Sequence, residues 1–141
     1  MACLDTTALL DLGKKPDHPV FVALKGLLVS LAAQGHQLVT TRFNVAELYM
    51  GLELARDRRK EHERIQMVMQ ETVILEFDEP AAEMYGRVAA ALRRQGSPIG
   101  DFDTLIASVA MSRGQSIVTR NAKHFRRIPS LVVIPYAEPF Q

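Results

Sequence analysis

The sequence predicts an α/β protein built on a parallel sheet of five strands. Short apolar runs alternate with longer amphipathic segments, as in consecutive βα units, and uninterrupted apolar runs suit strands that are buried on both faces. The chain has 141 residues, of which 48% are hydrophobic, and this is enough to fill one core. We therefore expect a single domain covering residues 1–141.

The predicted strands are runs of four to six residues rich in Val, Ile, Leu or Thr. They cover residues 2–5, 37–41, 72–77, 116–119 and 131–134. The segments between them predict helices over residues 7–12, 20–33, 43 to about 69, 79–95 and 102–113. The charged stretch 56–64 either projects into solvent or marks a break between two helices.

Single residues indicate where some of these helices begin and end. Asp78 is suited to cap a helix that starts at Glu79, and Pro80 is tolerated there because first-turn amides have no partner within the helix. Gly96 and Gly114 can end the helices before them in a left-handed conformation.

The composition argues against several classes of protein. A single cysteine, Cys3, excludes an internal disulfide and a structural zinc site of clustered thiolates, which fits a reducing compartment. No run approaches the about 18 apolar residues of a membrane span, and the first residues lack the features of a signal peptide. We therefore expect a cytoplasmic protein with no membrane association.

Basic residues gather in one part of the chain, although the formal net charge is only +1. Residues 113–127 contain no acid and five basic side chains, which are Arg113, Arg120, Lys123, Arg126 and Arg127. This stretch is a candidate surface for phosphate groups. A solvated basic face explains the same pattern, and on charge alone it is the better interpretation.

Polar side chains follow two of the predicted strands at the point where each strand ends. Asp5 ends the first strand, and Thr119, Arg120 and Asn121 end and follow the fourth. Ligands of open parallel sheets bind beyond the carboxyl ends of strands, where the strand order reverses, so these residues would face one crevice if the two strands were neighbours. Asp5 could equally be a helix cap, and Thr119 and Asn121 could be ordinary turn residues.

Glu47 lies on a predicted helix that is apolar around most of its circumference, and it is the only acid from Arg42 through Leu52. A carboxylate on a mostly buried helix is costly unless a cation or hydrogen-bond donors compensate for it, so a metal ion is a natural partner. Two other interpretations remain: Glu47 could reach solvent along the helix edge, or it could pair with Arg42.

The segment from Gly96 to Ser108 is a glycine-containing loop that leads into a helix with two acids at its start, Asp101 and Asp103. Helix dipoles alone favour acids at this position. Because residues two apart do not share a helix face, the two acids should have different roles. We assign metal binding to Asp103 and a capping or indirect role to Asp101, with the reverse assignment still open.

Three carboxylates from distant segments, Asp5, Glu47 and Asp103, could thus meet at one edge of the sheet. Ligands that are all oxygen suit Mg²⁺ or Mn²⁺, and such a cluster would repel itself without a cation. The four histidines show no close ligand spacing and are best interpreted as surface or loop residues, which disfavours zinc.

Together these segments resemble the PIN domain ribonucleases, and within them the VapC toxins of bacterial toxin–antitoxin pairs. A single piece such as Leu-Asp-Thr is common, but the whole series in this order spans nearly the entire chain. The series consists of Leu4-Asp5-Thr6, Ala46-Glu47-Leu48, Pro-Ile-Gly-Asp-Phe-Asp-Thr-Leu-Ile-Ala at 98–107, Val118-Thr119-Arg120-Asn121 and His124-Phe125.

The resemblance implies a three-layer PIN-like fold with strand order 3-2-1-4-5, in which the first and fourth strands are neighbours. It also implies metal binding by Asp5, Glu47 and Asp103. Many relatives carry a fourth acid just after the fourth strand, where this chain has Asn121. An amide oxygen can ligate a metal but brings no charge, so the departure weakens the expected affinity for a second ion.

The activity implied is endonucleolytic hydrolysis of RNA, with one or two Mg²⁺ or Mn²⁺ ions acting on the scissile phosphate, the attacking water and the leaving 3′ oxygen. Thr6 and Thr119 could orient the carboxylates or the water. The candidates for contacts with flanking phosphates are Arg120, Lys123, Arg126 and Arg127. The resemblance also implies a VapB-like antitoxin that covers the acidic crevice, and a homodimer.

Two other functions are compatible with parts of the pattern. A receiver-like signalling domain would use Asp78 and Thr119, but it needs paired acids after the first strand and a lysine after the fifth, where this chain has Asp5 and then Pro135-Tyr136. A PIN fold that has lost catalysis and only binds RNA or protein would be consistent with the missing fourth acid.

Overall fold

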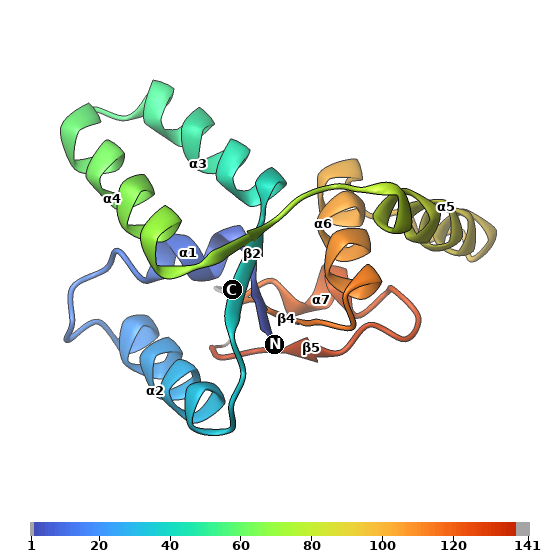
Figure 1. The fold of residues 1–141 in the computed structure, drawn as a ribbon, viewed down its shortest axis with the longest axis horizontal. Helices are drawn as coiled ribbons and strands as arrows, with labels where there is room; N and C mark the ends of the chain where they lie inside the picture. The colour runs from blue at the N-terminus through green and yellow to red at the C-terminus, as the bar shows by residue number, and fades with distance from the viewer. Residues whose placement is uncertain (1, 138–141) are drawn as a thin grey trace.

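A five-stranded parallel sheet forms the centre of the computed structural model, which describes residues 2–137 (Figure 1). The strands are β1 (Ala2–Leu4), β2 (Leu38–Thr41), β3 (Val73–Leu75), β4 (Ser116–Val118) and β5 (Val133–Ile134). Their order is β3-β2-β1-β4-β5, which confirms the predicted order. The domain expected over residues 1–141 includes residues 1 and 138–141, which lie outside the described range.

The centre of the sheet is β1, where Cys3 pairs with Val39 of β2 on one side and with Ile117 of β4 on the other. All five predicted strands are present, and each is shorter than expected. The edge strands β3 and β5 are three and two residues long. The internal strands β1 and β4 are also only three residues long.

Helices cover both faces of the sheet, and the fold therefore has three layers (Figure 1). One face carries α1 to α4, and the other carries α5 to α7. The helices are α1 (Thr6–Asp11), α2 (Pro19–Ala33), α3 (Arg42–Leu54), α4 (Arg58–Glu71), α5 (Glu79–Arg94), α6 (Asp101–Ser112) and α7 (Ala122–Phe125). Within residues 2–137, none of them combines the length and apolar character needed to cross a bilayer.

Successive residues of β1 feed two hydrophobic cores, because side chains alternate between the faces of a strand. Ala2 and Leu4 pack with Leu24 and other residues of α1 to α4. Cys3 packs on the opposite face with residues such as Ile106. The central strand is buried on both sides, which explains its uninterrupted apolar sequence.

Most helix boundaries agree with the prediction, with one exception. Of the two alternatives for the charged stretch 56–64, a break between two helices is the one observed, and Asp57 begins the second helix by accepting a hydrogen bond from the Lys60 amide at 3.1 Å. The one-turn helix α7 was not predicted, since four residues are too short for a periodic pattern. Asp78 caps α5 as expected, through the Ala81 amide.

Candidate active site

The polar residues at the carboxyl ends of β1 and β4 lie beside each other, because these strands are neighbours at the reversal of strand order. Asp5 follows β1 directly, and Thr119 follows β4. The Asp5 amide donates to the Val118 carbonyl at 3.0 Å, so the ladder between the strands continues to the start of the site. The predicted crevice therefore has the expected location.

Asp5 occupies the N-cap position of α1, yet its carboxylate makes no cap hydrogen bond to the helix. The side chain is only 4% exposed and accepts hydrogen bonds from other segments. The Thr119 hydroxyl donates to Oδ2 at 2.9 Å, and the side-chain nitrogen Nδ2 of Asn44 donates to Oδ1 at 3.3 Å. The carboxylate is therefore oriented by the residue after β4 and by the first turn of α3, and the interpretation of Asp5 as an ordinary helix cap is not supported.

Burial raises the pKa of Asp5 above its ordinary value. Hydrogen bonds from the Thr6 amide and the Thr119 hydroxyl act in the opposite direction, and the nearby carboxylate of Asp103 raises the pKa further. The net shift is upward, so the surrounding protein does not fully compensate for the negative charge of Asp5.

Glu47 is held from the other side of the site by a chain of uncharged donors. The Thr6 hydroxyl donates to Glu47 Oε1 at 2.7 Å, and the side-chain nitrogen Nδ2 of Asn44 donates to the hydroxyl oxygen of Thr6 at 2.9 Å. Burial raises the pKa of Glu47, the Thr6 hydrogen bond lowers it, and the charges of Asp5 and Asp103 raise it again. Arg42 pairs with Glu76 and not with Glu47, which removes one of the alternatives left open by the sequence.

Asn44 connects these two carboxylates and is fully buried. Its Oδ1 accepts from the Thr41 amide at 3.2 Å and from the Thr41 hydroxyl at 2.7 Å, completing a capping box at the start of α3. Its Nδ2 is then left to donate to Asp5 and Thr6. Because both ends of the amide are engaged, the first turn of α3 fixes the orientation of the acidic side chains.

Asp103 projects from the first turn of α6 and is 27% exposed. Its Oδ2 lies 3.6 Å from Nδ1 of His124, and the same Nδ1 lies 3.2 Å from the side-chain nitrogen Nδ2 of Asn121. Asp101 is exposed and lines a hollow between α5 and α6, with Tyr85 among its other lining residues. Gly100, not Asp101, occupies the N-cap position of α6.

The three carboxylates influence one another electrostatically in every pair: Asp5 with Asp103, Glu47 with Asp5, and Glu47 with Asp103. The predicted acids therefore lie close enough for their charges to raise the pKa values of Asp5 and Glu47. Within residues 2–137, however, no three Asp, Glu, His or Cys side chains are gathered at the spacing that encloses an ion. The donor set, all oxygen and under mutual repulsion, fits a hard divalent cation.

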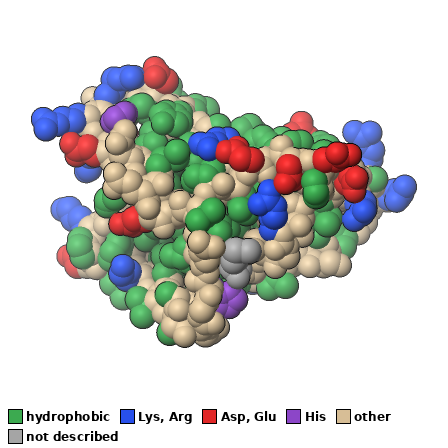
Figure 2. Space-filling model, in the orientation of Figure 1, with side chains coloured by type: hydrophobic (Ala, Val, Ile, Leu, Met, Phe, Trp, Pro, Cys, Tyr) green, Lys and Arg blue, Asp and Glu red, His purple; other side chains and the backbone are tan. Residues whose placement is uncertain are grey.

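The basic run of the sequence is distributed over different partners in three dimensions. Arg113 pairs with Asp78 at 2.7 Å, and Arg120 pairs with Asp11 at 2.8 Å. The remaining members, Lys123, Arg126 and Arg127, are exposed on and just after α7. The face in Figure 2 likewise shows acidic and basic side chains interspersed along α5 and over α3 and α4. Acids from distant segments thus neutralise part of the predicted basic surface.

The receiver-like alternative does not fit the observed topology. Receiver-type folds have strand order 2-1-3-4-5, which places the third strand inside the sheet. Here β3 is an edge strand. Asp78, the candidate phosphoacceptor, caps α5 and pairs with Arg113, whereas Thr119 hydrogen-bonds to Asp5.

Sequence reasoning missed three residues of the site. Asn44 has a recognisable signal, since it stands three positions after Thr41, the spacing of a capping box. Thr7 was interpreted only as the start of a helix, although its hydroxyl contacts both Asp5 and Thr119. His124 was classed with the surface histidines, and nothing in its spacing indicates that α7 brings it beside Asp103.

Comparison with known proteins identifies the family. The family model described as "PIN domain" matches residues 2–131. The chain belongs to the PIN domain family. It is 30% identical over 128 residues to "Ribonuclease VapC1" of Haemophilus influenzae strain R2866, which covers 91% of this chain and 92% of that protein. The "tRNA(fMet)-specific endonuclease VapC" of Salmonella typhimurium is 28% identical over 129 residues, again 91% and 92% of the two chains.

A solved structure of VapBC-1 from nontypeable Haemophilus influenzae matches this fold with a TM-score of 0.81. The sequence identity is 27%, and the match covers 96% of this chain and 97% of that one. The resemblance to VapC proteins and the PIN-like fold, both predicted from the sequence, are therefore confirmed.

Proposed function

We propose that this chain is a divalent-metal-dependent endoribonuclease and the toxin of a VapBC-type pair. The observation that supports the proposal is that Asp5, Glu47 and Asp103, from three separate segments, are near enough for the carboxylates of each pair to influence one another. The names of its relatives, a ribonuclease and a tRNA-specific endonuclease, support RNA as the substrate class.

Asp5, Glu47 and Asp103 are the residues that would hold Mg²⁺ or Mn²⁺. Asn121, whose side-chain nitrogen contacts His124 beside Asp103, would contribute an uncharged oxygen. When bound, such an ion would lower the pKa of a water molecule and offset the charge that develops on the scissile phosphate and the leaving 3′ oxygen.

The work of the protein groups is then to hold the carboxylates in a fixed orientation. Thr119 fixes Asp5, Thr6 fixes Glu47, and Asn44 donates to both Asp5 and Thr6. Every one of these donors is uncharged, so orientation is achieved while the negative charge stays available to a cation. This is the role that the sequence predicts for Thr6 and Thr119, extended to Asn44.

The test is cleavage of a panel of structured RNAs, tRNAs among them, with and without Mg²⁺ or Mn²⁺. Asp103→Asn should abolish cleavage, because it removes one of the three charges with almost no change in size. Asp101→Asn is the matched control: the same substitution, two residues away in the same helical turn, on a side chain that lines a different hollow. Its cleavage rate should stay within about twofold of wild type.

Each other outcome has a definite meaning. Loss of cleavage in Asp101→Asn but not in Asp103→Asn would reverse the assignment of the two acids. A folded wild-type chain that leaves RNA intact with both metals would contradict the nuclease and favour a PIN fold that only binds. Phosphorylation of Asp78 by acetyl phosphate would favour the receiver-like alternative.

The partner that we propose is a VapB-like antitoxin, as in the solved VapBC-1 complex. Co-expression with the product of a neighbouring small gene should yield a complex in which RNA cleavage is suppressed. Light scattering of the isolated chain tests the expected homodimer. A monomer that is fully active would contradict that part of the proposal.

A further inference from the structure

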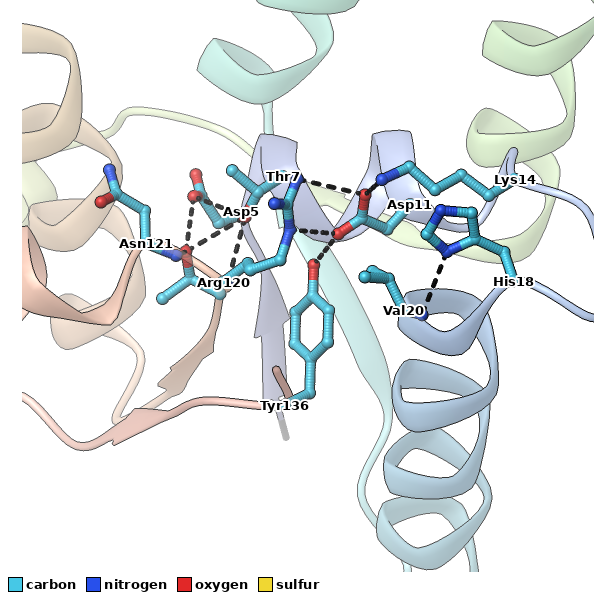
Figure 3. A network of polar contacts seen from close by, with 10 residues as sticks. Asp5, Thr7, Asp11, Lys14, His18, Val20, Arg120, Asn121 and Tyr136 are labelled. Atoms are coloured by element: carbon cyan, nitrogen blue, oxygen red, sulfur yellow. Dashed lines mark hydrogen bonds and ion pairs between the residues drawn. The ribbon is translucent and has the colours of Figure 1, made fainter. Parts of the chain in front are cut away.

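Asp11, at the end of α1, is a buried carboxylate outside the acidic cluster. It is 0% exposed and has three partners from different parts of the chain (Figure 3). Arg120 Nε donates to its Oδ2 at 2.8 Å, the Tyr136 hydroxyl donates to the same oxygen at 2.5 Å, and Lys14 Nζ lies 2.9 Å from Oδ1. The cluster thus joins α1, the loop after β4 and the segment after β5.

A second set of contacts runs from Arg120 towards the candidate active site. The Arg120 backbone amide donates to the Thr7 hydroxyl oxygen at 3.1 Å, and the hydroxyls of Thr7 and Thr119 lie 3.2 Å apart. Thr119 in turn donates to Asp5 Oδ2 at 2.9 Å. Arg120 is therefore held by its side chain in one network and donates its amide to another.

Counting hydroxyl protons gives the second network a direction. Each threonine hydroxyl has one proton and can accept two hydrogen bonds. The single proton of Thr119 is used towards Asp5, so Thr119 can only accept in its contact with Thr7. The single proton of Thr7 has two acceptors within reach, the Thr119 oxygen at 3.2 Å and Asp5 Oδ2 at 3.4 Å, and with either of them it points towards Asp5. Every donor in the chain from the Arg120 amide through Thr7 and Thr119 then points towards Asp5. Hydrogen bonds aligned in this way polarise and strengthen one another.

We propose that Asp11, Arg120 and Tyr136 are positioning residues for the carboxylate site, which act by holding the loop after β4 against α1. The loop held in this way keeps the Arg120 backbone amide, Thr7 and Thr119 within hydrogen-bonding distance of one another. These hydrogen bonds in turn fix the orientation of the Asp5 carboxylate. The inference rests on the proposed function, and it gives Arg120 a role different from the phosphate contact predicted from sequence. The guanidinium is consistent with this, since the side chain is only 18% exposed and makes two hydrogen bonds to Asp11.

The decisive variants are Tyr136→Phe and Arg120→Lys in the full chain. Tyr136→Phe deletes one hydroxyl and leaves the ring in place. Arg120→Lys keeps the charge but loses the paired donors to Asp11. Tyr85→Phe is the matched control, because it deletes a hydroxyl of the same kind on α5, away from the cluster. Three quantities are measured: the Kd for Mn²⁺ alone by calorimetry, kcat and KM for RNA cleavage, and the thermal unfolding midpoint.

We expect both variants to weaken Mn²⁺ binding and lower kcat by about tenfold, because partners that orient metal-binding groups typically affect affinity or activity to this extent. KM for RNA should stay within about twofold of wild type. Tyr85→Phe should match wild type in Kd and kcat. A split between kcat and KM, together with a change in Mn²⁺ affinity, would not arise from a purely structural role.

Two results would overturn the inference while leaving the nuclease intact. In the first, Tyr136→Phe lowers the unfolding midpoint but keeps the Kd for Mn²⁺ and kcat of the Tyr85→Phe control, so the cluster serves stability alone. In the second, Arg120→Lys raises KM in a salt-dependent manner with unchanged Mn²⁺ affinity, which identifies Arg120 as an RNA contact. A wild-type chain that neither binds Mn²⁺ nor cleaves RNA would instead overturn the proposed function, and the inference with it.

Discussion

Asn44 offers a sharp test of how the candidate active site is held. Replacing it by alanine removes both hydrogen bonds donated by Nδ2 and both accepted by Oδ1, while the Asn44 backbone amide can still donate to the Thr41 hydroxyl. The substitution therefore leaves the Thr41 amide without its side-chain acceptor and Asp5 with one donor fewer, both in a buried setting.

The magnitude of the effect follows from these unpaired groups. Leaving a buried donor or acceptor unsatisfied costs about 1–3 kcal/mol, and more for a charged group. With the Thr41 amide and the Asp5 carboxylate both affected, we expect Asn44→Ala to lower the free energy of unfolding by about 3 kcal/mol. For a chain of this size, that corresponds to a fall in the unfolding midpoint of about 10 °C.

Urea denaturation and scanning calorimetry measure this loss, with Gln95→Ala on an exposed side chain as control. Asn44→Asp adds a second comparison, since it keeps the size and the acceptors but replaces the donors with a charge beside Asp5. Repulsion and burial would raise the pKa of the new carboxyl, so its destabilisation should shrink as the pH falls. A loss below about 0.5 kcal/mol for Asn44→Ala, within the range of ordinary surface changes, would refute the reasoning.

Three further outcomes are expected. Mn²⁺ should raise the free energy of unfolding of the wild-type chain by mass action, by about 2.7 kcal/mol at one hundred times its Kd. The free energy of unfolding of Glu47→Gln should rise clearly less at the same Mn²⁺ concentration. Equal increases in calorimetry would contradict metal binding by Glu47. Burial raises the pKa of Asp11, but hydrogen bonds from Tyr136, Lys14 and Arg120 more than offset this, and the net shift is downward. The stabilising contribution of the Asp11 carboxylate should therefore be complete above the ordinary Asp pKa of about 3.9 and be lost as the pH falls below it. Asp11→Asn should lose less stability than wild type as the pH falls through this range. Identical acid denaturation curves would contradict a stabilising role of the charged Asp11. Glu76→Gln, which breaks an exposed ion pair, should change the free energy of unfolding by less than about 1 kcal/mol in urea denaturation, and a larger loss would mean that the pair is not as solvated as its exposure indicates.

The main features of the fold could be predicted from sequence because they depend on short-range patterns. Buried parallel strands give apolar runs, and parallel strands end at one edge of the sheet, so Asp5 and the residues after β4 could be assigned to the same edge without coordinates. That their strands are neighbours came from the family resemblance, which implied the strand order now observed. The break between α3 and α4 was left open because a mixed-charge segment is compatible with either choice.

Side-chain partners could not be predicted, since they depend on contacts between distant segments. Arg120 belongs to a basic stretch in the sequence, and only the structure shows that its partner Asp11 lies 109 positions away. Asn44 carries a local signal for a helix cap, but its donors to Asp5 and Thr6 require α3 and α1 to lie side by side. Local patterns thus identify which residues are polar and buried, whereas the tertiary structure determines which groups each of them contacts.

The two buried aspartates of α1 and its N-terminus show what distinguishes a structural carboxylate from one kept for a ligand. Asp11 is paired with Arg120 and Lys14, and its pKa is lowered despite its burial. Asp5 accepts side-chain hydrogen bonds from Thr119 and Asn44, and the Thr7 hydroxyl lies 3.4 Å away; all three groups are uncharged, and the pKa of Asp5 is raised. The charge of Asp11 is therefore neutralised by cationic side chains, whereas the charge of Asp5 is only oriented by uncharged donors. A carboxylate that is oriented but not neutralised, with two more acids beside it, has the electrostatic character required for binding a cation from solution.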